Sequence, residues 1–222
     1  MMVLAVLIVS VALLSYILGS ISFAVIFSKL FVKKDVRDYG SGNAGMTNVV
    51  RVAGVIPGLL TLLFDVLKGV IAVLLARDLV FDYLFRTSEY AFLHPVYGAY
   101  LCGVCCLLGH FFPVFFRFRG GKGVATAAGI MLVIDWRVLA CALTVFLIAF
   151  LITKIISIGS ILAASSLPLF AFVFFDANSG TNRVAVVLLA ALLGAIVVAK
   201  HKDNIKRIIK GEEKPITSKR RD

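Results

Sequence analysis

Residues 120–134 read GGKGVATAAGIMLVI, and the assignment of this segment decides the topology of the whole chain. Its apolar part, about 121–134, is shorter than the roughly 20 residues that an α-helix needs to cross a bilayer. Taken alone, the segment is ambiguous. Whether or not it crosses the membrane decides on which side every later loop and the C-terminus lie.

The composition places the chain in a membrane. Of its 222 residues, 61% are hydrophobic and 16% are charged, whereas soluble domains are about half apolar and about a quarter charged. The chain has too few polar residues to cover the surface of a water-soluble protein. We therefore expect a bundle of membrane-spanning helices. The net charge of +11 does not indicate nucleic acid as a partner, since the charges lie in short clusters between apolar runs and in the tail 200–222.

The distribution of Lys and Arg resolves the ambiguous segment. With seven spans and the N-terminus outside, 18 of the 23 Lys and Arg lie on the cytoplasmic side and four lie on the outer side, as the positive-inside rule requires. Without the short span, the basic tail would lie outside. We therefore predict an all-α, single integral-membrane domain over 1–222, with seven transmembrane helices, the N-terminus outside and the C-terminus cytoplasmic. The expected spans are about 3–27, 55–76, 91–113, 121–134, 137–153, 158–175 and 183–199, followed by the basic tail 200–222.

The cysteines do not indicate a metal site. All four lie in apolar stretches, and no His or Cys in a polar loop completes a cluster with them. We expect them to be small buried hydrophobic residues. They are Cys102, Cys105, Cys106 and Cys141.

Three polar, glycine-rich segments are all predicted on the cytoplasmic side. The first contains SGNAGMTN (41–48) followed by Arg51. Its glycines favour a tight turn that presents backbone N–H groups to an anion, and Arg51 offers a forked cation suited to phosphate. An ordinary interhelical turn with capping residues is the alternative. The candidate ligands are Ser41, Gly42, Asn43, Gly45, Thr47, Asn48 and Arg51.

The second segment is GHFFPVFFRFRGGKGVAT (109–126). Gly120, Gly121, Lys122 and Gly123 combine backbone N–H groups, a helix N-terminus and an ammonium group. It is not a P-loop, because Gly123 stands where a magnesium-binding Ser or Thr would be. His110 could be a base, a phosphate ligand or a polar helix end.

The third segment is KHKDNIKRIIKGEE (200–213), in which His201 and Asn204 would share one face of a helix. A juxtamembrane helix on anionic lipid is the alternative. Within the second span, Asp65 and Lys68 are three residues apart, and we expect them to pair with one another or with a motif residue. Ser160, at the start of the sixth span, could face the same site or could cap its helix.

These three strings resemble, in order and spacing, the motifs of the acyl-phosphate-dependent glycerol-3-phosphate acyltransferases of bacteria, the PlsY family. The resemblance covers essentially the whole chain. It implies seven spans and transfer of an acyl group from acyl-phosphate to the 1-hydroxyl of glycerol 3-phosphate, giving lysophosphatidic acid and inorganic phosphate. Because acyl-phosphate is already activated, no metal and no cofactor are expected.

The resemblance also implies roles for the residues. Ser41 and the loop amides would contact the acyl donor, and Arg51 and Lys122 would hold phosphate oxygens. His201, Asn204 and Ser160 would complete the polar site. We expect a phosphate oxygen of the substrate to accept the hydroxyl proton, with His201 the alternative acceptor.

The resemblance implies a multi-pass protein of the cell inner membrane with a cytoplasmic active site, on which a soluble acyl-phosphate-producing enzyme could dock. The competing hypothesis is a transporter of a small phosphorylated solute. Such a protein normally has polar groups at the bilayer midplane and two related halves, and neither is evident in the sequence. A metal-dependent lipid phosphotransferase is disfavoured because no acidic cluster lies on the cytoplasmic side.

Overall fold

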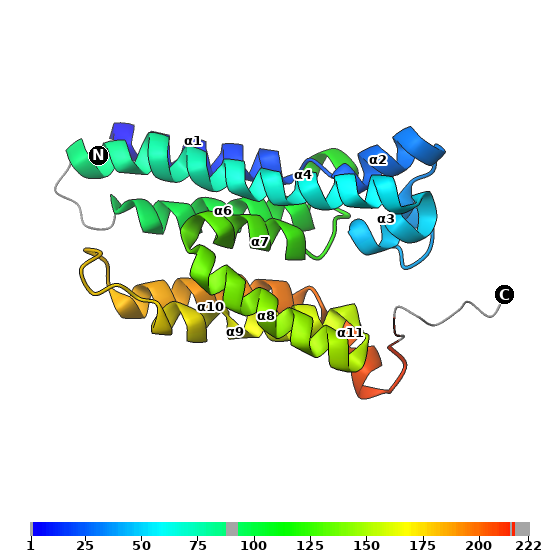
Figure 1. The fold of residues 1–222 in the computed structure, drawn as a ribbon. Helices are drawn as coiled ribbons and strands as arrows, with labels where there is room; N and C mark the ends of the chain where they lie inside the picture. Colours follow the sequence, from blue (N-terminus) through cyan, green and yellow to red (C-terminus); the bar gives the residue numbers. More distant parts are fainter. Residues whose placement is uncertain (1, 88–92, 214, 216–222) are drawn as a thin grey trace. The chain divides into compact units, whose positions relative to one another are not determined.

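The computed structural model describes residues 2–87, 93–213 and 215, and these residues form helices, turns and loops without a β-strand. The prediction of an all-α protein is therefore confirmed. The first two residues of the predicted span 91–113, together with Lys214 and residues 216–222 of the predicted tail, lie outside the described residues. The chain divides into two compact units, Met1–Ile134 and Asp135–Asp222, and each is described by itself (Figure 1).

The first unit contains seven α-helices within the described residues. They are α1 (Met2–Gly19), α2 (Phe23–Val32), α3 (Met46–Ala53), α4 (Val55–Leu74), α5 (Asp82–Thr87), α6 (Pro95–Phe111) and α7 (Val124–Ile134). A π-helical segment, η2 (Leu75–Phe81), joins α4 to α5, and two 3₁₀ turns, η1 (Val36–Asp38) and η4 (Val114–Phe116), lie in the loops. The second unit contains α8 (Trp136–Thr153), α9 (Ile156–Val173), α10 (Arg183–Ala199) and α11 (Lys202–Ile209).

Five helical segments of the described chain are long and apolar enough to cross a membrane: Met2–Val32, Val55–Thr87, Pro95–Phe116, Trp136–Thr153 and Ile156–Val173. The pair Arg183–Ala199 and Lys202–Ile209, bent by 64°, makes six if it counts as one span. The helix of the deciding segment, α7, has 11 residues, about 16 Å at 1.5 Å per residue. This is shorter than the apolar core of a bilayer, about 30 Å. The chain is thus a multi-pass membrane protein, while the count of seven and the orientation stay predictions.

The first predicted span, 3–27, is divided into two helices. Residues 20–22, between α1 and α2, form a turn in which the amide of Ser20 donates to the carbonyl of Tyr16 at 2.9 Å. Serine competes with helical backbone bonding through its own hydroxyl, and Ser20 and Ser22 flank this break. The break leaves the carbonyl of Ile21 free to accept a side-chain donor, which the site uses.

Glycines allow the helices of the first unit to pack backbone to backbone. A Cβ at Gly69 of α4 would collide with the carbonyl oxygen of Thr126 of α7, and one at Gly129 of α7 would collide with the carbonyl of Val66. In the same way, Gly109 of α6 lies against the carbonyl of Tyr16 of α1. Small residues are typical of close helix contacts in lipid, where there is no hydrophobic drive between helices.

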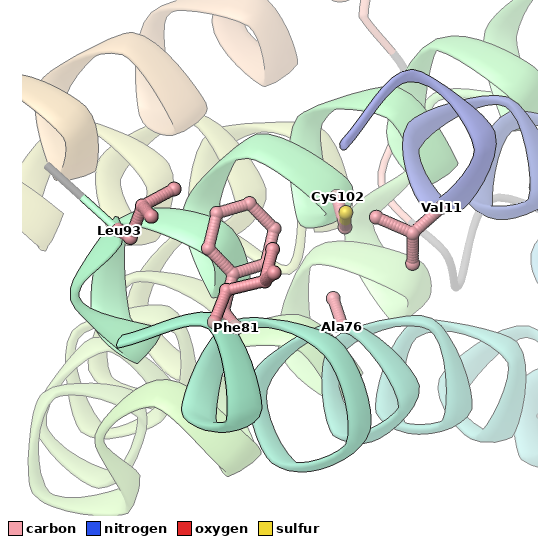
Figure 2. Close-up of a cluster of buried hydrophobic side chains, with 6 residues drawn as sticks. Val11, Ala76, Phe81, Leu93 and Cys102 are labelled. Carbon is pink, nitrogen blue, oxygen red and sulfur yellow. The ribbon is translucent and has the colours of Figure 1, made fainter. Parts of the chain in front are cut away.

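A buried cluster holds the π-helical segment against its neighbours (Figure 2). Phe81 and Ala76 of η2 lie among Val11 of α1 and Cys102 of α6. A Cβ at Gly98 of α6 would collide with the Phe81 ring, so this glycine makes room for the aromatic side chain. In the second unit, α9 packs against both α8 and α10.

The contact between α4 and α7 gives the first testable prediction. Gly69→Leu would force the two backbones apart, and overpacking of this kind costs about 1–3 kcal/mol. We expect a lower midpoint of thermal unfolding in detergent micelles. Leu63→Ala on the same helix, where the side chain is 51% exposed, is the control and should leave the midpoint nearly unchanged. Equal midpoints for Gly69→Leu and the wild type would contradict the close contact.

Candidate functional site

Asn48 organises the first glycine-rich loop from inside. Its side chain is buried, and its amide nitrogen donates to the carbonyls of Val36, Tyr39 and Asn43 at 2.9, 3.0 and 3.1 Å. Its amide oxygen accepts a hydrogen bond of 2.9 Å from the backbone N–H of Ser41. Asn48 therefore holds the loop closed with both ends of its amide group.

The internal bonding of this loop determines which groups remain for a ligand. Gly42 has φ +70 and donates to Tyr39, and the amide of Gly45 donates to Asn43. With Ser41 bound to Asn48, the backbone N–H groups of Asn43 and Ala44, and those of Met46 and Thr47 at the start of α3, have no partner among the described residues. Two pairs of adjacent amides, one in the loop and one at the start of α3, thus have no partner within the described part of the protein.

Three polar side chains of this segment are exposed to solvent or ligand. Ser41, Thr47 and Arg51 are exposed, and the latter two are one turn apart on α3. The stem of Arg51 lies over Gly40, with its Cδ 3.5 Å from the position that a Cβ on Gly40 would take. The Arg51 guanidinium has no ion pair or hydrogen bond with any described residue, so this cation is free to bind an anion.

The second glycine-rich loop packs onto the end of α6 and onto the first loop. A Cβ at Gly120 would collide with the carbonyl of His110, and one at Gly121 would collide with the carbonyl of Ala44 and lie 2.5 Å from Nε2 of His110. The amide of Gly121 donates to the carbonyl of His110 at 3.3 Å. Gly123, at φ +75, turns the chain into α7. The structure thus brings the segments of Ser41–Arg51 and Gly120–Gly123 together, with the partly buried Lys122 between glycines.

His110 is tied to the two charges inside α4. The Lys68 ammonium lies 2.9 Å from Nδ1 of His110 and 2.8 Å from Oδ1 of Asp65, and it donates to the carbonyl of Ile21 at 2.9 Å. The expected pairing of Asp65 with Lys68 is therefore present, and it includes a residue of the second motif. All three side chains are buried.

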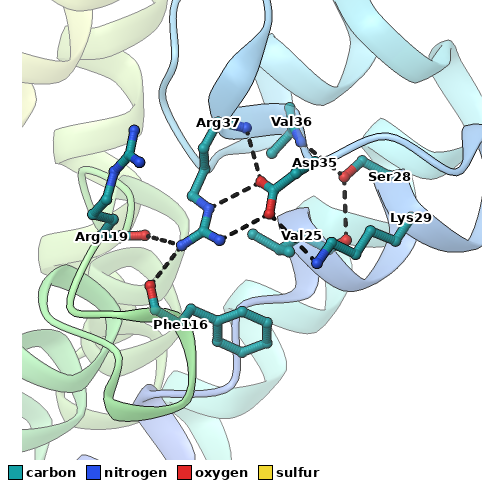
Figure 3. A network of polar contacts seen from close by, with 8 residues as sticks. All are labelled: Val25, Ser28, Lys29, Asp35, Val36, Arg37, Phe116 and Arg119. Carbon is teal, nitrogen blue, oxygen red and sulfur yellow. Dashed lines mark hydrogen bonds and ion pairs between the residues drawn. The ribbon is translucent and has the colours of Figure 1, made fainter.

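Arg37 joins the two loops from a position that the sequence did not single out (Figure 3). Its guanidinium pairs with Asp35 through bonds of 2.8 and 2.9 Å and donates to the carbonyls of Phe116 and Arg119 at 2.6 and 3.3 Å. Between these carbonyls, Arg117 and Phe118 have φ +57 and +56, a conformation that costs non-glycine residues about 1–2 kcal/mol each. The bonds from Arg37 hold this strained turn in place.

The second unit carries the remaining predicted residues. His201 precedes α11 and is buried, with Nδ1 2.8 Å from the carbonyl of Val197. Ser160 is buried in α9 and donates to the carbonyl of Ile156 at 3.0 Å. Asn204 of α11 is buried and donates through Nδ2 to Glu213 at 2.6 Å.

Glu213 is the organising residue of this region, and the sequence analysis missed it. Its Oε1 accepts hydrogen bonds from Ser157 and Asn204, and its Oε2 pairs with Arg207, all at 2.6 Å. Burial by itself would raise the pKa of Glu213, but these three donors lower it below the ordinary value. Because the Asn204 amide nitrogen is bound to Glu213, its amide oxygen is the end left to face a ligand. No sequence signal separates Glu213 from Glu212 beside it.

A substitution at Asn48 tests whether the first loop depends on this side chain. Asn48→Asp keeps the shape but removes the amide donor, since a carboxylate cannot donate to the three carbonyls. Leaving several buried groups unpaired costs about 1–3 kcal/mol each, so the thermal unfolding midpoint should fall markedly. Thr47→Ser, at the neighbouring exposed position, should leave it unchanged. A midpoint for Asn48→Asp equal to that of the wild type would show that the loop is held in another way.

The Asp35–Arg37 pair gives a prediction about pH. Hydrogen bonds from Arg37 lower the pKa of Asp35 from 3.8 to about 2. A carboxylate with a lowered folded-state pKa stabilises the protein above its unfolded-state pKa, and this contribution disappears as the pH falls through the folded value. The stability difference between the wild type and Asp35→Asn should therefore be constant above about pH 4 and shrink towards pH 2. Chemical unfolding measured across this range checks it; a difference that stays constant down to pH 2 would contradict the pairing.

The chain is similar over nearly its whole length to known enzymes. The family model "Glycerol-3-phosphate acyltransferase" matches residues 9–211. Glycerol-3-phosphate acyltransferase 2 of Bacillus anthracis is 39% identical over 204 residues, covering 92% of this chain and 96% of that protein. Glycerol-3-phosphate acyltransferase of Prochlorococcus marinus (strain MIT 9515) is 36% identical over 208 residues, covering 94% and 96%.

Two crystal structures of PlsY (YgiH), an integral membrane glycerol 3-phosphate acyltransferase, share this fold. Its glycerol 3-phosphate form superposes with a TM-score of 0.78 at 35% sequence identity, covering 94% of this chain and 95% of that one. Its lysophosphatidic acid form gives a TM-score of 0.76, also at 35% identity, covering 94% of each chain. The chain described here belongs to the PlsY family of integral membrane glycerol-3-phosphate acyltransferases.

Proposed function

We propose that this protein transfers a fatty acyl group from acyl-phosphate to the 1-hydroxyl of glycerol 3-phosphate, giving lysophosphatidic acid and inorganic phosphate. The observation that carries the proposal is the meeting of the two glycine-rich loops, in which Gly121 fits against the carbonyl of Ala44. The segments that bear Arg51 and Lys122 therefore adjoin, as a reaction between two phosphate-bearing substrates requires. The relative whose structures are named for glycerol 3-phosphate and for lysophosphatidic acid supports the same substrate and product.

The chemistry asks for positioning and charge stabilisation. The substrate hydroxyl oxygen attacks the acyl carbonyl carbon, the bond from that carbon to the bridging phosphate oxygen breaks, and phosphate leaves with the electron pair. We propose that a phosphate oxygen takes the hydroxyl proton, with His201 the alternative acceptor. Phosphate is already a good leaving group, so the protein's contribution is to orient the substrates and to stabilise the oxyanion.

Seven of the candidate residues have roles in this scheme. The exposed guanidinium of Arg51 and the ammonium of Lys122 would hold phosphate oxygens, and we assign glycerol 3-phosphate to Lys122. The hydroxyl of Ser41 and the unpaired amides of Asn43 and Ala44 would bind the acyl donor. The second unit would contribute His201, the amide oxygen of Asn204 and Ser160.

The same proposal includes the setting of the reaction. We place the protein in the cell inner membrane as a single domain with seven spans, its N-terminus outside and its C-terminus and active site on the cytoplasmic side. α11, with Lys202, Lys206 and Arg207, and Lys210 directly after it, would give this side a basic surface. A soluble acyl-phosphate-producing enzyme could deliver the donor there.

The test uses purified full-length protein in lipidic mesophase with palmitoyl-phosphate and glycerol 3-phosphate, following both phosphate and lysophosphatidic acid. We expect phosphate release to require glycerol 3-phosphate and to match lysophosphatidic acid mole for mole. Lys122→Ala should lower kcat/KM roughly 10²–10³-fold, because a charge-stabilising donor at a reacting centre is worth about that much. Arg51→Lys should also have a lower kcat/KM, because lysine keeps the positive charge but lacks the planar guanidinium group that can donate two hydrogen bonds to one phosphate.

Lys206→Ala is the matched control, since it removes one exposed positive charge of α11 outside the proposed machinery. It should retain near wild-type turnover. Phosphate release without glycerol 3-phosphate, or equal losses in Lys122→Ala and Lys206→Ala, would overturn the assignment. Activity with palmitoyl-coenzyme A in place of palmitoyl-phosphate would overturn the proposed choice of donor.

A further inference from the structure

Asp65, Lys68 and His110 form a buried polar group in the first unit that the proposed reaction does not use. Their side chains are 4%, 1% and 6% exposed. Burying such groups in a membrane protein is costly, and they are retained where they serve a purpose. The distances between these three side chains determine which nitrogen of the His110 ring can donate a hydrogen bond and which can accept one.

The lysine decides which ring nitrogen of His110 carries the proton. An ammonium group has three donors and no acceptor, and the Lys68 ammonium lies 2.9 Å from Nδ1 of His110. A hydrogen on Nδ1 would point at a hydrogen of Lys68 across this distance. Nδ1 must therefore present its lone pair, and in the neutral ring the proton resides on Nε2.

The other edge of the ring faces the junction of the two loops. A Cβ added at Gly121 would lie 2.5 Å from Nε2 and would collide with the carbonyl of Ala44, so Nε2 and this carbonyl lie on the same side of Gly121. Nε2 thus lies beside the place where the first and second glycine-rich segments meet. A donor here can bond an oxygen at the junction, but it has no lone pair with which to accept a proton.

We propose that the Asp65–Lys68 pair fixes His110 as the Nε2–H tautomer, so that His110 is a hydrogen-bond donor that positions the two loops and is not the base of the reaction. Asp65 and Lys68 are then positioning residues that act through His110. The part of this inference that concerns the reaction rests on the proposed function, whereas the tautomer does not.

His201 provides the contrast within the same chain. Its Nδ1 lies 2.8 Å from the carbonyl of Val197, and because a carbonyl only accepts, Nδ1 must be the donor. The neutral ring then has its lone pair on Nε2. The two histidines are held in opposite tautomers, and of the two only His201 can offer Nε2 as an acceptor.

Nitrogen NMR of the full-length protein labelled at histidine reads the tautomers directly. The chain has three histidines, so His110→Gln and His201→Gln assign their signals by difference. In the neutral rings we expect a pyridine-type Nδ1 and a pyrrole-type Nε2 for His110, and the reverse for His201. A pyrrole-type Nδ1 on His110 in the wild type would overturn the proposal.

The role of the lysine is tested without leaving a buried charge unpaired. In Asp65→Asn combined with Lys68→Met, both charges are absent, so the mutant can fold while the anchor at Nδ1 is lost. We expect the His110 signals to become a mixture of the two tautomers, whereas the His201 signals stay unchanged. An unaltered Nε2–H tautomer in this double variant would show that the pair does not set it.

Two replacements of His110 separate a donor from a base. The Gln amide nitrogen can occupy the place of Nε2, whereas the shorter Asn cannot reach it. We expect His110→Gln to stay within about tenfold of wild-type kcat, because the donor is kept, and His110→Asn to lose a further tenfold or so, about what one lost hydrogen bond costs. Equal collapse of kcat in both variants would indicate a proton acceptor and overturn the role. If the wild type transfers no acyl group, the proposed function fails, while the NMR result still decides the tautomer.

Discussion

A buried ammonium group must be surrounded by acceptors, and in the first unit this requirement at Lys68 connects three helices. The chain breaks after α1, and the carbonyl of Ile21 released there receives a hydrogen bond from Lys68. Asp65 supplies the counter-charge from the same helix, and His110 supplies the last acceptor from α6. Because lipid offers no water to such groups, the positions of α1, α4 and the end of α6 depend on one another.

The loops outside the helices are fixed by side chains that replace backbone pairing. Asn48 closes the first loop with its amide group, and Arg37 reaches from that loop to the turn that contains Arg117 and Phe118. Glu213 has the equivalent role in the second unit, where it fixes Asn204. In each case one buried or half-buried side chain serves several partners, so the exposed groups around it can be presented to a ligand without rearrangement.

The helical architecture could be read from the sequence because apolar length and charge position are local properties. Six predicted spans correspond to helices, and the spacing of Asp65 and Lys68 correctly indicated their pairing. The break at residues 20–22 and the continuation of the second helical segment to Thr87 were not predicted. These features depend on tertiary contacts, such as the room that Gly98 leaves for Phe81.

The site was predicted in its parts but not in its connections. The glycine-rich motifs identified the loops, yet the contact of Arg37 with Phe116 spans 79 residues and that of Glu213 with Ser157 spans 56. No pattern within a motif can indicate such partners. Likewise, the sequence allowed His110 to be a base, a phosphate ligand or a polar helix end. The 2.9 Å distance between its Nδ1 and the Lys68 ammonium, which the sequence could not give, narrows this choice.

The arrangement on α4 also has a consequence for how the protein enters the membrane. A lone lysine or aspartate at the centre of a spanning helix disfavours insertion by about 2.5–3.5 kcal/mol. Asp65 and Lys68 lie three residues apart on one helix, so the segment carries its own counter-ion when it leaves the translocon. It can partition into lipid as a net neutral pair before α6 has been synthesised, and the histidine joins a pair that is already formed.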